Sequence, residues 1–172
     1  MPDILFDGIV GRNALQHSSE RQTVFKQLAR HLAPKGRIVL AETIPFQTLR
    51  LYSLLKKQTL PAITLQRLQQ AEDSLYTSDP DRYWNLDAIA GWVENTDLAA
   101  AVELLELPTE LAVTPRLQTR WFDEDSRYMQ HLAQTFATKE LAVIQQAYKR
   151  DLGTTVSWKT HIALITLYRT EP

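Results

Sequence analysis

Two stretches decide the fold: ILFDGIVG at residues 4–11 and RIVLAETI at residues 37–44. Each contains a short apolar run, which is typical of a strand buried on both faces. Between them, apolar residues recur at helical spacing after a serine pair suited to an N-cap, and Pro34 and Gly36 mark the end of that helix. A strand, a crossover helix and a second strand of these lengths predict a right-handed parallel unit.

The remaining sequence predicts two more strands among helices. Residues 116–122 partly alternate polar and apolar side chains after a proline, which indicates an edge strand. Residues 161–168 are apolar on both faces and are expected to form a central strand, antiparallel to residues 37–44. Helices are expected at about residues 46–57, 61–75, 86–93, 97–106, 123–136 and 138–150. We therefore expect an α/β domain with a three-layer, partial Rossmann-like fold and a four-stranded mixed sheet flanked by helices.

Composition narrows the class of protein. The 172 residues suit one domain, and 44% hydrophobic with 23% charged residues is typical of a globular chain. A net charge of -1 argues against a broad nucleic-acid surface. The absence of cysteine excludes disulfides, thiolate zinc sites and a cysteine nucleophile. With no signal peptide and no apolar run long enough to span a membrane, we expect a cytoplasmic protein without a membrane partner.

Two motifs resemble a known family. FDGIVGRNALQH at residues 6–17 resembles the fourth strand of class I S-adenosylmethionine-dependent methyltransferases and the loop after it. LAPKGRIVLAE at residues 32–42 looks like the family's turn into its fifth strand. The order of the later elements also agrees, because the family's last strand inserts antiparallel between its fifth and sixth. The resemblance implies the C-terminal half of such a domain, whose complete form transfers a methyl group from S-adenosylmethionine.

The family's cofactor-binding half has no counterpart here. Its glycine-rich loop would need closely spaced glycines, but no G-x-G pattern occurs among the five glycines. We therefore expect residues 1–172 to be part of a longer chain that binds S-adenosylmethionine only when complete, so that the isolated chain binds no cofactor and is inactive. The sequence also resembles, more weakly, the methyltransferase-like tail behind AAA+ recombination-factor ATPases in cyanobacterial fusion proteins. This suggests an alternative function, a non-catalytic interaction or regulatory domain of a larger protein.

Polar residues follow the two parallel strands, at the edge where open α/β sheets bind ligands. Asn13 could position a substrate and His17 could act as a general base. Alternatively, Asn13 shapes a turn and His17 precedes the helix. Glu42 and Thr43 end the neighbouring strand, where a carboxylate could bind a substrate amine or cation. The alternative for Glu42 is a solvated strand end.

The resemblance adds further candidate substrate contacts. The family uses the loop after its fourth strand near the methyl-transfer site, which implies Arg12 and Leu15. It often covers the substrate with the region that here contains Tyr83 and Trp84, whose rings could stack on a planar ligand. Alternatively, these aromatic residues anchor the loop to the core. The histidines show no ligand-like spacing, so no metal site is expected.

The first strand also suggests a partner. In the complete family fold another strand covers its outer side, so residues 4–10 would expose unpaired backbone groups if these 172 residues folded alone. Such an edge is a template for pairing with another chain, and the run contains a single charge, Asp7. We expect a two-fold homodimer, with this strand or the helix beside it at the interface. The alternative is that the Met1 end refolds to cover its own edge. The missing N-terminal half of the domain is a further expected partner. Nucleic acid is not indicated as a partner.

Overall fold

The computed structural model describes residues 4–55 and 59–170. The chain forms two compact units, each considered by itself. Unit 1 consists of Met1–Thr48, Pro80–Leu107 and Thr160–Pro172, and unit 2 of Leu49–Asp79 and Pro108–Lys159. Both units combine separate stretches of sequence, so each core depends on contacts between residues that are distant along the chain.

A four-stranded sheet has the order β1-β2-β4-β3. β1 pairs parallel with β2, with Ile9 opposite Ile38, and β2 pairs antiparallel with β4, with Leu40 opposite Ile165. The predicted α/β class, the mixed sheet and the central antiparallel strand are confirmed. The strand bounds are Phe6–Arg12 for β1, Leu32–Thr43 for β2, Leu98–Ala112 for β3 and Thr155–Arg169 for β4.

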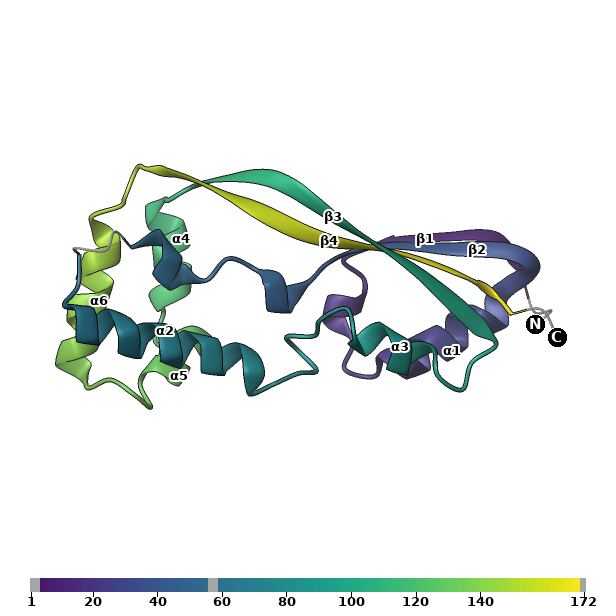
Figure 1. Ribbon diagram of the computed structural model, residues 1–172, viewed down its shortest axis with the longest axis horizontal. Coiled ribbons are helices and arrows are strands. Elements are labelled where there is room, and N and C mark those ends of the chain that lie inside the picture. Colours follow the sequence, from purple (N-terminus) through teal and green to yellow (C-terminus); the bar gives the residue numbers. More distant parts are fainter. Residues whose placement is uncertain (1–3, 56–58, 171–172) are drawn as a thin grey trace. The chain divides into compact units, whose positions relative to one another are not determined.

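The helices of unit 1 lie on one face of the sheet (Figure 1). These are α1 (Arg21–His31) and α3 (Ala88–Val93), and they enclose a core with alternate residues of β2 and β4. The core includes Phe25, Ile38, Leu40, Ile89, Ile165 and Leu167. On the other face Val10 is 84% exposed, so the described part of unit 1 supplies one of the two helical layers expected from the sequence.

Two predicted elements are wrong, and they lie next to each other. Residues 98–112 form the edge strand β3 instead of a helix. Their alanines, leucines and glutamates favour a helix, but pairing with β4 overrides that weak preference. Residues 115–122 form the helix α4 instead of a strand. Thr114 caps α4 by accepting a hydrogen bond from the Leu117 amide, and the proline occupies the first turn, where its missing N–H costs nothing.

The helix expected over residues 46–57 is replaced by two 3-10 turns, η2 (Pro45–Gln47) and η3 (Leu51–Leu54). Its last two residues lie outside the described part of the chain. Helices α2 (Ala62–Thr77) and α6 (Thr138–Lys149) confirm the prediction, whereas the helix expected over residues 123–136 is limited to α5 (Arg127–Leu132).

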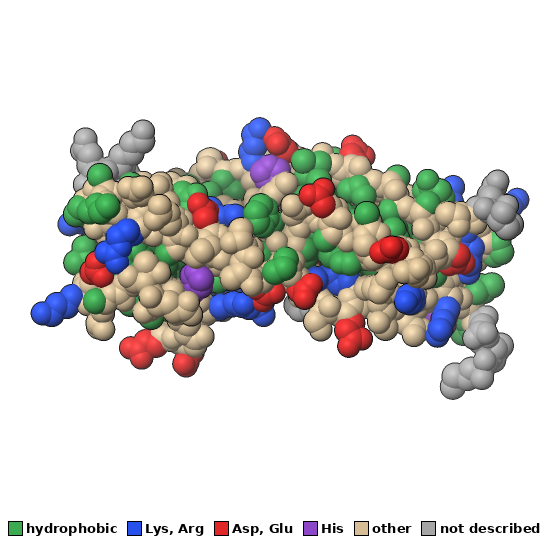
Figure 2. Space-filling model, turned by 60° about the horizontal axis from the view of Figure 1, so that its bottom comes forward, with side chains coloured by type: hydrophobic (Ala, Val, Ile, Leu, Met, Phe, Trp, Pro, Cys, Tyr) green, Lys and Arg blue, Asp and Glu red, His purple; other side chains and the backbone are tan. Residues whose placement is uncertain are grey.

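Unit 2 has its own hydrophobic core, built from η3, α2, α5 and α6. Its most buried members include Leu68, Leu132, Ile144 and Tyr148. The face of the molecule in Figure 2 intersperses acidic and basic side chains, as is usual for a solvated surface. None of the helices in the described residues is long and apolar enough to cross a membrane.

Candidate functional site

The loop after β1 turns sharply at Asn13, which adopts a left-handed backbone conformation with φ of 49°. Its amide donates to the Ala41 carbonyl at 3.0 Å, and its Oδ1 accepts from the Thr43 amide at 3.0 Å. Asparagine tolerates this conformation better than most residues. Asn13 therefore shapes the turn and ties it to the end of β2, and a role in positioning substrate stays a prediction.

Glu42 holds the same loop from β2. Its carboxylate is fully buried, with Oε1 2.8 Å from the Ala14 amide and Oε2 3.2 Å from the Leu15 amide. The alternative of a solvated strand end is therefore wrong. A buried carboxylate is tolerated only where donors replace water, and these two N–H groups do so. The Glu42 carboxylate thus holds the loop after β1 through these two hydrogen bonds.

Arg21 contacts the loop from α1. It is buried, its Nε donates to the Leu15 carbonyl at 3.0 Å, and its guanidinium lies 5.1 Å from the centre of the Trp92 ring. Both backbone polar groups of Leu15 are thus bound by charged side chains of other elements. The Leu15 side chain is in the hydrophobic core, so it anchors the loop after β1 to that core.

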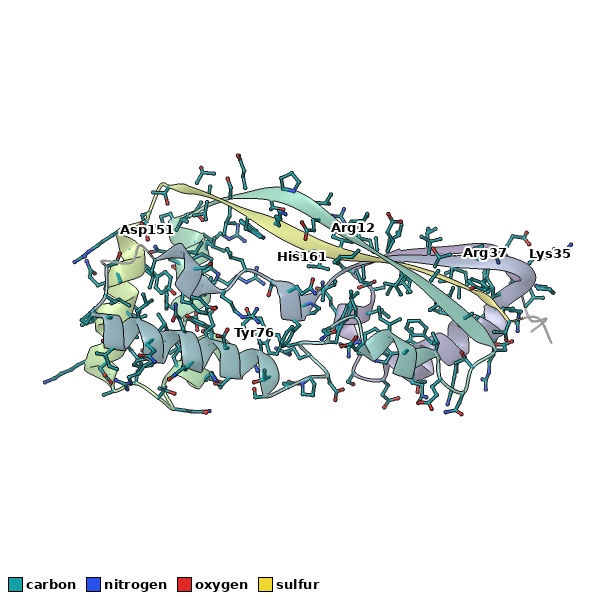
Figure 3. All side chains as sticks on the ribbon, in the orientation of Figure 1. Arg12, Lys35, Arg37, Tyr76, Asp151 and His161 are labelled. Atoms are coloured by element: carbon teal, nitrogen blue, oxygen red, sulfur yellow. The ribbon has the colours of Figure 1, made fainter. Side chains whose placement is uncertain are left out.

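The remaining residues of this edge differ in accessibility. Arg12 is exposed at the end of β1 (Figure 3), opposite Ala41 of β2. His17 ends η1 (Leu15–His17), the turn that follows the loop. Thr43 is half-buried and ends β2. The structure brings Asn13, Glu42 and Thr43 into one hydrogen-bonded arrangement, as the parallel strands predicted; their roles toward a substrate stay predictions.

Tyr83 and Trp84 lie in the loop before α3. Trp84 is buried in the core, with its ring edge-on to Trp92 at 5.0 Å, and its carbonyl accepts from the Phe46 amide at 3.3 Å. These contacts are those of a residue that anchors its loop to the core. Tyr83 is half-buried, and a contact of its ring with substrate stays a prediction.

The sequence reasoning missed two polar residues beside this edge. His161 lies on β4, with its backbone carbonyl accepting from the Ile44 amide at 3.1 Å and its Nε2 3.5 Å from Glu106 Oε1. Gln47, in η2, follows the same end of β2. Glu106 was not recognised as a neighbour of His161 because residues 97–106 were predicted to form a helix. The one residue that argued for an edge strand there was Pro108.

Unit 2 contains a separate perturbed carboxyl group. Glu72 of α2 is fully buried and accepts hydrogen bonds from the Leu51 amide, the Tyr52 amide at 3.0 Å and the Tyr128 hydroxyl at 3.2 Å. Burial raises the pKa of Glu72 to about 7, although these donors act in the opposite direction. Burial, together with the nearby Tyr148 and Glu72, also raises the pKa of Tyr128. The contacts of Glu72 are structural, because they fasten η3 to α2.

The glycines do not form a cofactor cradle. A Cβ at Gly11 would lie 2.9 Å from the Leu40 side chain, and one at Gly36 would lie 2.7 Å from the Leu32 side chain, so both positions serve packing within the fold. Gly8 and Gly91 face open space. The sequence has no closely spaced glycines of the kind that let a backbone approach a nucleoside. That the chain alone binds no S-adenosylmethionine stays a prediction. The described residues also contain no group of three or more His, Asp or Glu side chains that could hold a metal ion.

No protein-family model matches the chain, and no curated protein matches it. Among solved structures, it is similar to the YcgJ protein from Bacillus subtilis at 18% identity, with a TM-score of 0.49, over 100% of this chain and 67% of that one. It is similar to a putative methyltransferase from Bacillus halodurans at 14% identity and a TM-score of 0.47, over 97% of this chain and 72% of that one.

A third similar structure is a Haemonchus contortus phosphoethanolamine N-methyltransferase solved with S-adenosylhomocysteine. Its identity to this chain is 16% and the TM-score is 0.40, over 96% of this chain but 34% of that one. The chain thus spans about a third of the length of that enzyme. The descriptions of two of these three structures name methyltransferases.

Proposed function

We propose that this chain is the substrate-side part of a methyltransferase-like domain, in which methyl transfer takes place only when the cofactor-binding part is also present. One observation carries the proposal. The sheet joins a parallel β1–β2 pair to an antiparallel β4, and the β1 loop is held in one conformation at the carboxyl end of β2 by Asn13 and Glu42. Such an edge is where open α/β sheets bind ligands.

Calorimetric titration with S-adenosylmethionine tests whether the cofactor binds only when the cofactor-binding part is also present. The 172-residue chain is expected to produce no binding heat at micromolar concentration, because it has no glycine loop whose amides could approach the cofactor. The longest natural protein that contains these residues is expected to bind S-adenosylmethionine. A complete methyltransferase of known cofactor affinity serves as the positive control.

The titrations of the 172-residue chain and of the longer protein test different parts of the proposal. Micromolar binding by the 172 residues alone would show that the cofactor site is within this chain. If the longer protein does not bind S-adenosylmethionine, the methyltransferase function is contradicted and a non-catalytic interaction domain is favoured.

The second candidate function has an observation of its own. β1 is an edge strand that, among the described strands, pairs only with β2, and two of its apolar side chains, Phe6 and Val10, are exposed. An apolar strand edge of this kind is typical of a surface that pairs with another chain. A role in assembly, as part of a larger protein such as an AAA+ ATPase, is the alternative proposal.

A further inference from the structure

A hollow of about 350 Å³ lies in unit 1, at the end of the sheet where β2 begins. Its walls are the second half of α1, the turn between α3 and β3, and the end of β4 (Figure 1). Its volume is within the range of small-molecule sites, roughly 300–1,000 Å³. Polar side chains line most of it: Lys26, Arg30, Asn95, Thr96, Asp97 and Arg169.

Hydrogen bonds join the walls to one another, which gives the hollow a defined shape. The Gln22 side chain of α1 donates to the Glu94 carbonyl in the turn at 3.1 Å. The Thr170 amide, directly after β4, donates to the Asp97 carbonyl in the same turn at 2.9 Å. Asn95 reverses the chain there in a left-handed conformation with φ of 59°, which asparagine tolerates. The turn is thus tied both to the helix and to the strand.

Arg169 provides a further connection, and its charge is already paired. Its Nη2 donates to the Ala29 carbonyl at 2.7 Å and to the Leu32 carbonyl at 3.0 Å. Its Nη1 forms an ion pair with the Asp97 carboxylate. Carbonyl groups at a helix C-terminus ordinarily repel anions, but these two are bound by a cation. Since the charges of Arg169 and Asp97 offset each other, the field in the hollow depends on the remaining charged groups of its lining.

Those remaining groups are the side chains of Lys26 and Arg30. They lie one turn apart on α1, both are exposed, and neither forms an ion pair with a described residue. Like charges four residues apart on a helix repel each other, and an anion bound between them removes that repulsion. The turn adds the side-chain amide of Asn95, which has two N–H donors. The lining therefore favours an anionic ligand with several acceptor oxygens.

We propose that the hollow binds a phosphate group, either as free phosphate or at the end of a small phosphomonoester. A phosphate dianion matches the two unpaired cations, whereas a carboxylate has a single charge. Its oxygens accept charge-assisted hydrogen bonds from Lys26 and Arg30, and the planar arginine fork suits two oxygens at once. The hollow lies at the opposite end of β2 from Asn13 and Glu42, so this site goes beyond the proposed function and does not rest on it.

The test is a titration of the ¹⁵N-labelled 172-residue chain with inorganic phosphate and with glycerol phosphate, followed by NMR at constant ionic strength. At about pH 7.5, above the second phosphate pKa of about 6, both ligands are dianions. The backbone amides of Asn95 and Thr96 and the Arg30 Nε–H are expected to shift together and to saturate at millimolar ligand. Tighter binding of glycerol phosphate assigns the hollow to phosphomonoesters, and equal binding assigns it to free phosphate.

Two double variants separate a specific site from general attraction by charge. Lys26→Gln with Arg30→Gln is expected to weaken binding at least about tenfold, the loss of one charge-assisted hydrogen bond. The matched control, Arg116→Gln with Lys139→Gln, removes the same two charges from exposed positions of unit 2. It is expected to keep the wild-type affinity, because these positions are in the other unit.

Acetate at the same ionic strength is the control ligand, and it is expected to bind at least about tenfold more weakly because it has one charge. Equal affinity for acetate and phosphate, equal weakening in the two double variants, or unmoved Asn95 and Thr96 amides would each overturn the proposal. None of these results bears on S-adenosylmethionine binding by the longer protein, so the two proposals fail separately.

Discussion

At the scale of single residues, two buried carboxylates, those of Glu42 and Glu72, accept hydrogen bonds from backbone amides. Glu42 binds two amides of the β1 loop, and Glu72 binds two amides of η3, each from an element distant in sequence. A carboxylate in such a position organises a loop that has too few residues to form a core of its own. The two groups are thus structural supports, in separate units.

Glu72 is expected to make the stability of unit 2 depend on pH. Its pKa is about 7 in the folded protein and 4.5 in its ordinary state, so the folded state binds the proton more tightly. The resulting stabilisation is fully present below pH 4.5 and is lost as pH rises through about 7. A difference of about 2.5 pKa units corresponds to roughly 3 kcal/mol at most.

Urea unfolding at a series of pH values from 4.5 to 8 measures this effect. In Glu72→Gln the decline in unfolding free energy is expected to become much flatter, while Glu124→Gln, at an exposed position of the same unit, is expected to keep the wild-type slope. An unchanged slope in Glu72→Gln would assign the pH dependence to another group.

Glu42→Gln tests the support of the β1 loop. Glutamine keeps one acceptor oxygen, so one of the amides of Ala14 and Leu15 loses its partner, and we expect a loss of about 1–3 kcal/mol in unfolding free energy. Hydrogen exchange at these two amides is expected to accelerate. Glu94→Gln, at an exposed position of unit 1, is the control. Unchanged exchange at both amides would contradict the role assigned to Glu42.

At the scale of elements, the first part of β2 depends on a glycine, Gly36, beside the irregularity in its pairing with β1. A Cβ at Gly36 would lie 2.9 Å from the Phe6 carbonyl oxygen and 3.1 Å from the Ala33 carbonyl oxygen, in addition to its contact with the Leu32 side chain. Backbone atoms cannot move aside as a flexible side chain can. The close approach of β1 and β2 at Gly36 therefore requires the absence of a side chain.

Gly36→Ala is accordingly expected to lower the unfolding free energy by about 1–3 kcal/mol. Gly91→Ala provides a matched control, because a Cβ there meets nothing within 4 Å and the residue lies in α3. In a helix this substitution is expected to raise stability by about 0.5–1 kcal/mol. The opposite signs are measured by urea denaturation, and equal changes in the two variants would refute the packing argument.

At the scale of the whole molecule, the open edge of β1 raises the question of self-association. β1 exposes its outer backbone edge and a nearly bare Val10 on the face away from α1. Pairing of two such edges about a two-fold axis would satisfy the backbone groups and cover these side chains. The predicted homodimer concerns the 172-residue chain by itself, because further residues of a longer protein can cover the same strand edge.

Light scattering at micromolar concentration is expected to show a mass near twice 19.7 kDa for the 172-residue chain. Val10→Lys places a charge on the exposed strand without touching the core, and is expected to shift the protein toward the monomer. Ile63→Lys, at a position that is 65% exposed on α2, is the control and is expected to leave the mass unchanged. A monomeric wild-type chain would exclude this assembly.

The sequence by itself determined the β1–α1–β2 unit and the central position of β4. Those elements have strong local signals: apolar runs of strand length, a helical repeat between them, and a Pro-Gly turn. It also placed Asn13 and Glu42 at one edge, because carboxyl ends of parallel strands coincide. Their hydrogen-bond partners lie about thirty residues away and could not be read from spacing.

Tertiary structure alone decided the edge strand and the partners of the buried polar groups. Residues 98–112 have helical composition, and they form a strand because β4 offers unpaired backbone groups along its length. Thr114 and Pro115 then begin a helix where alternation had indicated a strand. The Ile44 and Phe46 amides likewise donate to the carbonyls of His161 and Trp84, which come from distant parts of the chain. Local patterns carry backbone preference, whereas the position of a buried polar atom is set by contacts that only the folded chain creates.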